Sequence, residues 1–259
     1  MPRVVAIIPA RMGSSRFPGK PLAPLLGRTM IEHVCARAAL CRALSEVHVA
    51  TCDTEIQRAV EAFGGSVIMT SDAHERASDR VAEAAEGLEA GIVVMIQGDE
   101  PLVTPEMIAA ALAPMLEDET VSCVNLARRI TDPKEFADPN TVKVVTNLRG
   151  DALYFSRAQI PTSFFARPPE AATTPVFKQV CVIPFRRAAL REFARMKPTP
   201  LERAESIDML RIIEHGGSVR IVETRADTHA VDTPEDLRLV ESLMRDDPLI
   251  ARYGEKTTQ

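Results

Sequence analysis

The chain of 259 residues lacks the cysteine pattern of a metal-binding or disulfide-stabilised domain. Its five cysteines are scattered along the sequence and form no Cys-x-x-Cys pair. Scattered cysteines in odd number are typical of reduced thiols in the cytoplasm, so they favour neither a zinc site nor a disulfide framework. The five are Cys35, Cys41, Cys52, Cys123 and Cys181.

Long apolar runs and an excess of positive charge are also missing. No apolar stretch approaches the roughly 18 residues that a membrane span requires, so we expect no membrane partner. The net charge of -5 argues against a general nucleic-acid-binding surface. Because Met1-Pro2-Arg3 leads directly into an apolar run, we expect no signal peptide and a cytoplasmic location.

The two commonest nucleotide-binding motifs are absent as well. Neither Gly-x-x-x-x-Gly-Lys-Ser/Thr nor Gly-x-Gly-x-x-Gly occurs in the sequence. Their absence argues against a P-loop kinase and against a dinucleotide-binding dehydrogenase.

Residues 8–20 nevertheless form a loop suited to a polyanion. The apolar run 4–8 leads into this loop, which holds two arginines, one lysine, two glycines and two serines. Backbone N–H groups and fixed cations directly after a strand can hold a triphosphate at the carboxyl edge of a sheet. The alternative is an ordinary solvated surface loop, which three cations in so short a stretch make less favoured.

Alternating strand-like and helix-like segments predict an α/β fold. Apolar runs predict strands over 4–8, 46–51, 66–69, 92–97 and 121–126, and helical spacing predicts helices over 30–44, 55–63, 78–88 and 105–116. Strands that are apolar on both faces predict a three-layer α/β/α architecture around a mostly parallel, doubly wound sheet. Ligands of such sheets bind beyond the carboxyl ends of the strands.

After about residue 126 the alternation changes, and a smaller inserted sheet region is expected. The segments in question are strands over 142–146, 151–155, 177–184 and 219–223, a helix over 199–215, and a loop over 161–175 that is predicted to be mobile or to contact a partner. We expect one domain over residues 1–247, with an insertion at about 127–200 for acceptor binding or dimer contact. A polar, frayed C-terminal tail is expected over 248–259.

Two carboxylates are candidate ligands for Mg²⁺. Asp99 follows the strongest apolar run in the chain, and a carboxylate at a strand tip beside a phosphate loop can hold Mg²⁺ against phosphate oxygens. A solvated turn carboxylate or a helix cap is the alternative. Asp232 opens the stretch Asp-Thr-Pro-Glu, which is equally suited to begin a helix, and both roles stay open for it.

The loop over residues 8–20 resembles the signature loop of the sugar nucleotidyltransferases. Its Ile-Pro-Ala-Arg, followed by Ser-Arg-Phe-Pro-Gly-Lys-Pro-Leu, most resembles the CMP-Kdo synthetases, which are 3-deoxy-manno-octulosonate (Kdo) cytidylyltransferases. Further similar stretches lie at 97–101, 140–145, 152–161 and 231–237. The resemblance runs from residue 3 to about 245 and implies a fold of the nucleotide-diphospho-sugar transferase type.

The resemblance also implies an activity and a set of site residues. A hydroxyl of an acidic acceptor would attack the α-phosphorus of CTP and release pyrophosphate, in a cytoplasmic homodimer that supplies a surface glycan such as lipopolysaccharide. Arg11 and Lys20 would stabilise the pyrophosphate, and Asp99 and Asp232 would ligate Mg²⁺. The implied nucleotide-binding residues are Pro9, Ala10, Arg11, Ser15, Lys20, Arg76, Ser78, Arg80 and Gly98, and the implied acceptor-binding residues are Gln97, Arg157, Gln179 and Asp208.

Arg157 is a reasonable partner for the acceptor carboxylate, because a guanidinium can form two parallel hydrogen bonds to it. A surface ion pair is the alternative.

Several positions depart from the family pattern. The base-reading segment, Ser-Gly-Thr-Glu/Asp-Arg in the family, is Arg-Ala-Ser-Asp-Arg over residues 76–80. Gln179 and Ile183 stand where the family has a histidine and a tyrosine that contact the sugar, and Asp208 replaces a glutamate. Each lost partner would leave a Kdo hydroxyl unpaired, at about 1–3 kcal/mol.

These departures leave the acceptor open between Kdo, a close 2-keto acid sugar and another small acid such as a phosphonate. A nucleotide-binding protein without catalysis is a further alternative. The presence of both cations and both carboxylates argues against it, because a protein that only binds nucleotide would not need the two metal ligands.

Overall fold

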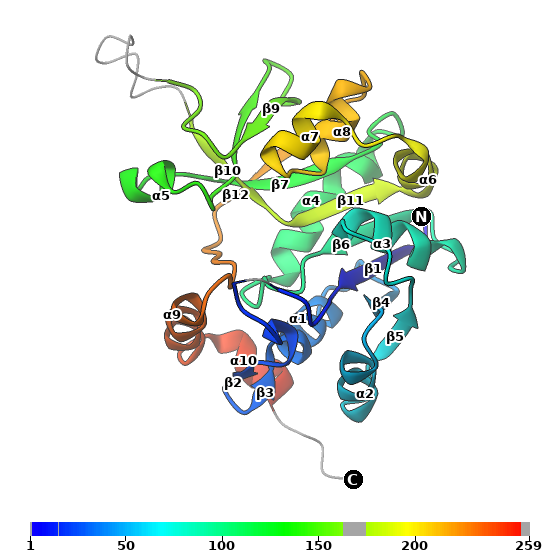
Figure 1. The fold of residues 1–259 in the computed structure, drawn as a ribbon, viewed down its shortest axis with the longest axis vertical. Helices are drawn as coiled ribbons and strands as arrows, with labels where there is room; N and C mark the ends of the chain where they lie inside the picture. Colours follow the sequence, from blue (N-terminus) through cyan, green and yellow to red (C-terminus); the bar gives the residue numbers. More distant parts are fainter. Residues whose placement is uncertain (1, 15, 163–174, 255–259) are drawn as a thin grey trace. The chain divides into compact units, whose positions relative to one another are not determined.

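The chain folds into two compact units, which the computed structural model describes over residues 2–14, 16–162 and 175–254 (Figure 1). The first unit holds residues 1–109 and 227–259, and the second holds residues 110–226. The first boundary falls within α4 (Pro105–Glu117). The expected insertion at 127–200 lies inside the second unit. Residues 163–174, most of the segment predicted to be mobile, lie outside the described residues.

Parallel strands form the centre of the first unit, in the order β6-β1-β4-β5 (Figure 1). They are β1 (Val4–Pro9), β4 (Glu46–Thr51), β5 (Ser66–Met69) and β6 (Ile92–Ile96). The chain builds outward from β1 to β5 and then returns to β6 on the other side of β1. The winding therefore reverses between β1 and β6, and ligands of such sheets bind at that point. The predicted parallel, doubly wound sheet is confirmed.

The helices of the first unit connect these strands and continue along the chain to residue 254. They are α1 (Met30–Ala39), α2 (Thr54–Ala62), α3 (Ala77–Glu86), α9 (Pro234–Met244) and α10 (Pro248–Gly254), with a short 3₁₀ turn η1 (Lys20–Leu22) and the hairpin β2 (Pro24–Leu25) and β3 (Arg28–Thr29). Within the part of the chain that the structure describes, every helix is too short or too polar to span a bilayer.

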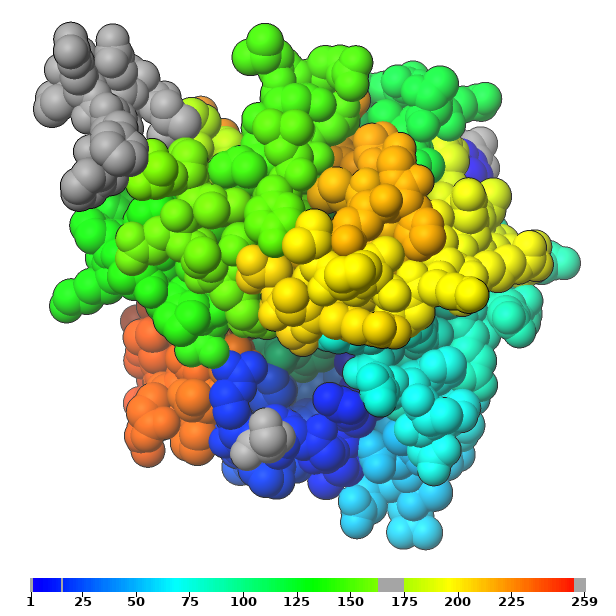
Figure 2. All heavy atoms as spheres, turned by 45° about the horizontal axis from the view of Figure 1, so that its top comes forward, coloured from blue at the N-terminus to red at the C-terminus, as the bar shows by residue number. Residues whose placement is uncertain are grey.

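An apolar cluster joins the C-terminal helices to the start of the chain. Its buried members are Leu25, Met30, Leu102, Val231, Val240 and Met244, with Phe17, Leu26, Leu237 and Ile250 packed against it. In Figure 2 the blue segment after β1 accordingly borders the orange segment that contains α9. This cluster holds Phe17 and Val231 in place, and each lies next to a charged residue of the candidate site.

Residues 248–254 form α10, whereas we expected a frayed polar tail there. Two of its side chains explain the order. Ile250 packs against the apolar cluster, and the Tyr253 hydroxyl lies 3.0 Å from Nδ1 of the buried His33 on α1.

His33 makes the stability of this contact depend on pH. Burial lowers the pKa of His33 below its ordinary value of 6.5, and a hydrogen bond with the Leu25 carbonyl only partly opposes the shift. The unfolded chain therefore binds a proton at a higher pH than the folded chain, and stability is lost as the pH falls below 6.5. We expect the melting temperature to fall more steeply between about pH 7.5 and pH 5.5 for the native chain than for His33→Gln. Equal slopes in thermal scans by circular dichroism would contradict this.

A mixed sheet forms the second unit, with strand order β12-β7-β10-β8-β9 (Figure 1). The strands are β7 (Val124–Arg129), β8 (Lys143–Thr146), β9 (Ala152–Ser156), β10 (Phe177–Val180) and β12 (Arg220–Thr224). Only β12 and β7 pair in parallel, and the others pair antiparallel. The strand expected over 177–184 is two strands, because the ladder ends at Val180 and β11 (Val182–Arg186) follows.

Short helices complete the second unit: α5 (Pro133–Ala137), α6 (Arg187–Arg195), α7 (Pro200–Glu205) and α8 (Met209–Glu214). The single helix expected over 199–215 is interrupted at Ser206, whose φ of 56° is left-handed and ends α7. A buried ion pair between Glu202 and Arg211 then joins α7 to α8.

Candidate active site

The loop after β1 folds back on itself at the carboxyl edge of the parallel sheet. Its Met12 N–H donates to the Asp53 carboxylate at 2.7 Å, and the Gly19 N–H donates to the Met12 carbonyl at 3.1 Å. Gly19 has a φ of 72°, in the left-handed region that favours glycine. This closed turn places Lys20 at the start of η1, where its side chain is mostly buried.

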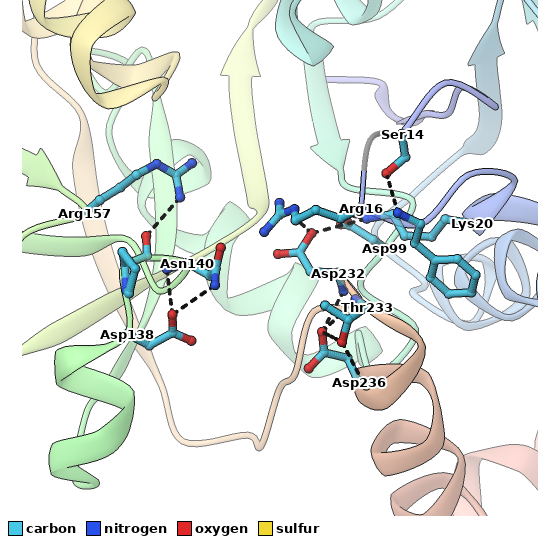
Figure 3. Close-up of polar contacts among 12 residues, drawn as sticks. Ser14, Arg16, Lys20, Asp99, Asp138, Asn140, Arg157, Asp232, Thr233 and Asp236 are labelled. Carbon is cyan, nitrogen blue, oxygen red and sulfur yellow. Dashed lines mark hydrogen bonds and ion pairs between the residues drawn. The ribbon is translucent and has the colours of Figure 1, made fainter.

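Lys20 lies between the two predicted metal ligands (Figure 3). Its Nζ is 2.6 Å from Oδ2 of Asp99 and 3.5 Å from Oδ1 of Asp232. Arg16 extends from the same loop, and its guanidinium is 3.0 Å from Oδ1 of Asp232. The first unit therefore brings two cations and two carboxylates into one compact group.

Backbone pairing between two distant segments brings Asp99 and Asp232 together. The Val231 N–H donates to the Asp99 carbonyl at 2.9 Å. Nearby, the Thr228 hydroxyl donates to Oε2 of Glu100 at 2.7 Å, and both of these residues are buried. The segment that precedes α9 is thus attached to the loop that follows β6.

The start of α9 shows that Asp232 is not the residue that caps this helix. Thr233 is the residue that caps the helix, in a reciprocal arrangement with Asp236. The Asp236 carboxylate accepts hydrogen bonds from the N–H groups of Asp232 and Thr233, at 3.1 and 2.8 Å. The carboxylate of Asp232 is therefore not needed as a cap, and it pairs with Arg16 and Lys20 instead.

We expect Thr228→Val to weaken this attachment. Glu100 would lose a buried donor, so the free energy of unfolding should fall by about 1–3 kcal/mol. Because Asp99 and Asp232 would be held less firmly, kcat should fall by about tenfold. Urea denaturation and initial rates measure the two effects. Thr131 is exposed, so Thr131→Val is the control and should change the free energy of unfolding by no more than about 0.5 kcal/mol. A Thr228→Val variant with the stability and kcat of this control would rule out the attachment.

Gly98 allows the ends of β1 and β6 to approach closely. A Cβ atom at this position would lie 3.0 Å from the Pro9 carbonyl oxygen and 3.3 Å from Cδ1 of Ile31. A side chain would therefore push the loop after β6 away from the loop after β1. Glycine here keeps Gln97 and Asp99 beside the cation-rich loop.

A pocket of about 300 Å³ opens at this edge of the first unit. The predicted residues that line it are Pro9, Ala10, Arg11, Lys20, Arg76, Arg80, Gln97, Gly98, Asp99 and Asp232. Ser78 is fully buried and is not among the lining residues. Ser15 lies outside the described residues.

Four polar or charged residues that line the pocket were missed as site residues: Ser14, Arg16, His74 and Glu75. Arg16 had a usable signal, because it is one of the two arginines of the loop after the first apolar run. His74 pairs with Glu83. Burial alone would raise the pKa of Glu83, but hydrogen bonds from His74 and from the Ser71 N–H hold it below its ordinary value.

Arg80 is almost fully buried, although it lines the pocket. Its guanidinium donates to the Thr70 hydroxyl and, at 3.2 Å, to the Ser71 carbonyl. These contacts fix the stretch after β5 against α3, which sets the wall of the pocket formed by residues 74–77.

In the second unit, Arg157 is held by Glu205 rather than by a surface ion pair. The Arg157 N–H donates to Oε2 of Glu205 at 2.9 Å, and its Nε donates to the Glu205 carbonyl at 2.8 Å. A third bond, of 3.1 Å, runs from the guanidinium to the Pro139 carbonyl (Figure 3). No motif or spacing in the sequence indicated Glu205 as a site residue. Desolvation would raise its pKa, yet donors from Arg157, Ser156 and Tyr154 outweigh that effect and lower it.

The other predicted acceptor residues of the second unit have separate surroundings. The Gln179 amide donates to the buried Asn125 side chain at 2.6 Å. Ile183, which was noted only as standing where the family has a tyrosine, is buried in the apolar core, with 2% of its surface exposed. Asp208 is partly exposed and begins α8. Gln97, the fourth predicted acceptor residue, lines the pocket of the first unit.

The Asp99 and Asp232 carboxylates suit Mg²⁺ that arrives with phosphate. Mg²⁺ is commonly held by one or two carboxylates together with substrate phosphates and waters. Both carboxylates already converge on one positive group, the Lys20 ammonium. Among the described residues, no group of three or more acidic, histidine or cysteine side chains is arranged to hold a metal ion. The two carboxylates fit a metal whose remaining ligands come from the substrate.

The fold and the pocket together define an α/β nucleotidyltransferase. A family model described as cytidylyltransferase matches residues 5–225. The 3-deoxy-manno-octulosonate cytidylyltransferase of Geobacter metallireducens is 47% identical over 94% of this chain and 98% of its own length. That of Myxococcus xanthus is also 47% identical, over 94% and 97%.

A solved structure of CMP:2-keto-3-deoxy-manno-octonic acid synthetase, complexed with CTP, superposes with a TM-score of 0.85 and 41% identity, covering 93% of this chain and 98% of the other. The chain belongs to the cytidylyltransferase family and, within it, to the 3-deoxy-manno-octulosonate cytidylyltransferases, also called CMP-Kdo synthetases. It is therefore an enzyme of nucleotidyl transfer, and the resemblance inferred from the sequence is confirmed.

Proposed function

We propose that this enzyme transfers CMP from CTP to Kdo and releases pyrophosphate, in a reaction that depends on Mg²⁺. The observation that carries the proposal is the convergence of Lys20, Asp99 and Asp232 beside a pocket lined by further cations. The names of the relatives support Kdo as acceptor, and the CTP complex of the related synthetase supports CTP as donor.

In this proposal the cations of the pocket stabilise the leaving group. Arg11 and Lys20 line the pocket and would neutralise charge that gathers on pyrophosphate as the bond to the α-phosphorus breaks. Little covalent chemistry is required of the protein, because positioning and charge neutralisation supply most of the rate enhancement. Pro9, Ala10 and Gly98 would shape the nucleotide site by keeping the β1 and β6 ends close together.

Asp99 and Asp232 would hold Mg²⁺. Bound there, the ion supplies positive charge that neutralises phosphate oxygens and makes the acceptor hydroxyl more acidic. Arg76 and Arg80 would contribute to the nucleotide site from the start of α3, and Gln97 would contact the acceptor. In the second unit, Arg157 is the proposed partner of the acceptor carboxylate, oriented by Glu205.

A second acceptor remains a candidate because of Gln179, Ile183 and Asp208. The amide of Gln179 is bound to Asn125, and Ile183 offers no polar group and is buried. These two positions therefore present less hydrogen-bonding capacity than a histidine and a tyrosine would. Another 2-keto-3-deoxy sugar acid, or a phosphonate, would use the same nucleotide site and the same reaction.

The experiment is a pyrophosphate-release assay with CTP, Mg²⁺ and a panel of acids. Kdo, other octulosonic and nonulosonic acids and simple phosphonates are compared by kcat/KM. The highest value for Kdo supports the first proposal. A kcat/KM about a hundredfold higher for another acid would show that this acid, and not Kdo, is the acceptor.

We also propose a cytoplasmic homodimer whose product feeds a surface glycan such as lipopolysaccharide.

A further inference from the structure

Lys20 occupies the position where the proposed site needs a metal cation. Its ammonium group contacts both carboxylates, at 2.6 Å from Asp99 and 3.5 Å from Asp232. Arg16 adds a second positive charge at 3.0 Å from Asp232. In the protein alone, therefore, the two negative charges of the site already face two positive charges from the loop after β1.

This internal neutralisation opposes the binding of a free divalent ion. An ion between Asp99 and Asp232 would lie within a few ångströms of the Lys20 ammonium, and like charges at such distances repel. Solvent screens the repulsion only in part, because just 13% of the Lys20 side chain is exposed, against 26% for Asp99 and 28% for Asp232. The metal should therefore bind more tightly once the ammonium has moved to another anion.

A triphosphate in the pocket is such an anion. Lys20 lines the same pocket as Gly13 and Ser14, so phosphate oxygens could be reached by rotation of its flexible stem. A lysine ammonium is a compact point charge without the fixed geometry of a guanidinium, so it can exchange a carboxylate for a phosphate with little constraint. The exchange would leave both carboxylates available to the metal.

We infer that Lys20 is an internal counter-ion that keeps the Asp99–Asp232 site closed to free divalent cations until a triphosphate takes its ammonium group. The inference rests on the proposed function, because it assumes that Asp99 and Asp232 are the metal ligands. It adds an order of events: nucleotide enters before or with the metal, and the metal does not bind first. Lys20 would thus couple the binding of the metal to the binding of the nucleotide, in addition to contacting the nucleotide.

The test is a titration of the nucleotide-free protein with Mn²⁺, with free Mn²⁺ measured by electron paramagnetic resonance. Lys20→Met removes the ammonium and should bind Mn²⁺ at least about tenfold more tightly than the native chain. Lys20→Gln should show the same gain, and circular dichroism confirms that each variant is folded. Adding Asp99→Asn to Lys20→Met should abolish the gain, which assigns the new site to this pair of carboxylates.

The matched control is Arg11→Met. Arg11 comes from the same loop and lines the same pocket, but within the described residues the ion pairs of Asp99 and Asp232 are made by Lys20 and Arg16 and not by Arg11. Arg11→Met removes the same amount of positive charge as Lys20→Met. Because that charge does not contact either carboxylate, the Mn²⁺ affinity should stay at the native value. The inference would be overturned by any of three results. These are Mn²⁺ binding by the native chain as tight as that of Lys20→Met, an equal gain in Mn²⁺ affinity in Arg11→Met and Lys20→Met, and no gain in Mn²⁺ affinity in folded Lys20 variants.

The counter-ion role of Lys20 and the proposed reaction can fail independently of each other. If the native enzyme releases pyrophosphate from CTP and Kdo while Lys20→Met gains no Mn²⁺ affinity, the counter-ion role fails and the reaction stands. If no acid supports pyrophosphate release but Lys20→Met gains an Asp99-dependent Mn²⁺ site, the proposed reaction fails and the counter-ion role stands.

Discussion

Asp99→Asn is expected to lower kcat for nucleotidyl transfer by about a thousandfold. The change keeps the size of the side chain but removes the charge that would hold Mg²⁺ and that now pairs with Lys20. The loss should fall on the chemical step, because the cations that line the pocket are unchanged. Pyrophosphate release at saturating CTP measures kcat, and calorimetry should show that CTP still binds.

Asp246→Asn is the matched control for this substitution. Asp246 is an exposed residue after α9, so the same chemical change should leave kcat and stability at their native values. A folded Asp99→Asn variant with the kcat of this control would remove Asp99 from the catalytic machinery.

Arg211→Met is expected to lower the free energy of unfolding by about 3–5 kcal/mol. Arg211 donates to both carboxylate oxygens of Glu202, at 2.9 and 2.6 Å, and the two side chains are only 2% and 1% exposed. Its guanidinium also lies 4.2 Å from the centre of the Phe193 ring. Removing it would leave the Glu202 charge buried without its main partner. Urea denaturation monitored by circular dichroism measures the change.

Two further variants separate burial from charge. Arg238→Met breaks an ion pair with Glu235 in which both side chains are exposed, so it should change stability by less than about 1 kcal/mol. Adding Glu202→Leu to Arg211→Met removes the stranded charge and should restore part of the loss. A loss for Arg211→Met no larger than that for Arg238→Met would show that the buried pair does not stabilise the second unit.

The sequence was sufficient to predict the edge of the sheet at which the candidate site lies. The apolar runs that became β1 and β6 are buried along their whole length, which is typical of parallel strands covered on both faces. Because parallel strands end at one edge, Lys20 and Asp99 were predicted close together, and their charges are 2.6 Å apart. The apolar pattern within each strand is enough to predict the edge at which the strands end.

Contacts that depend on how one loop or helix attaches to another could not be predicted in this way. The pairing of Lys20 and Arg16 with Asp232 depends on how the segment before α9 attaches to Glu100, and no periodicity encodes that attachment. Glu205 was missed for the same reason, because its role arises only when α7 meets β9. The break at Ser206 depends on a single left-handed residue within an otherwise helical pattern.

Identification of the product is the most direct test of the proposed CMP transfer from CTP to Kdo. The enzyme is incubated with CTP, Mg²⁺ and Kdo, and the mixture is analysed by mass spectrometry and ³¹P NMR. We predict a single new phosphodiester that joins CMP to Kdo, with one equivalent of pyrophosphate and no product from Asp99→Asn. Intact CTP and unchanged Kdo after prolonged incubation with folded native enzyme would contradict the proposed transfer.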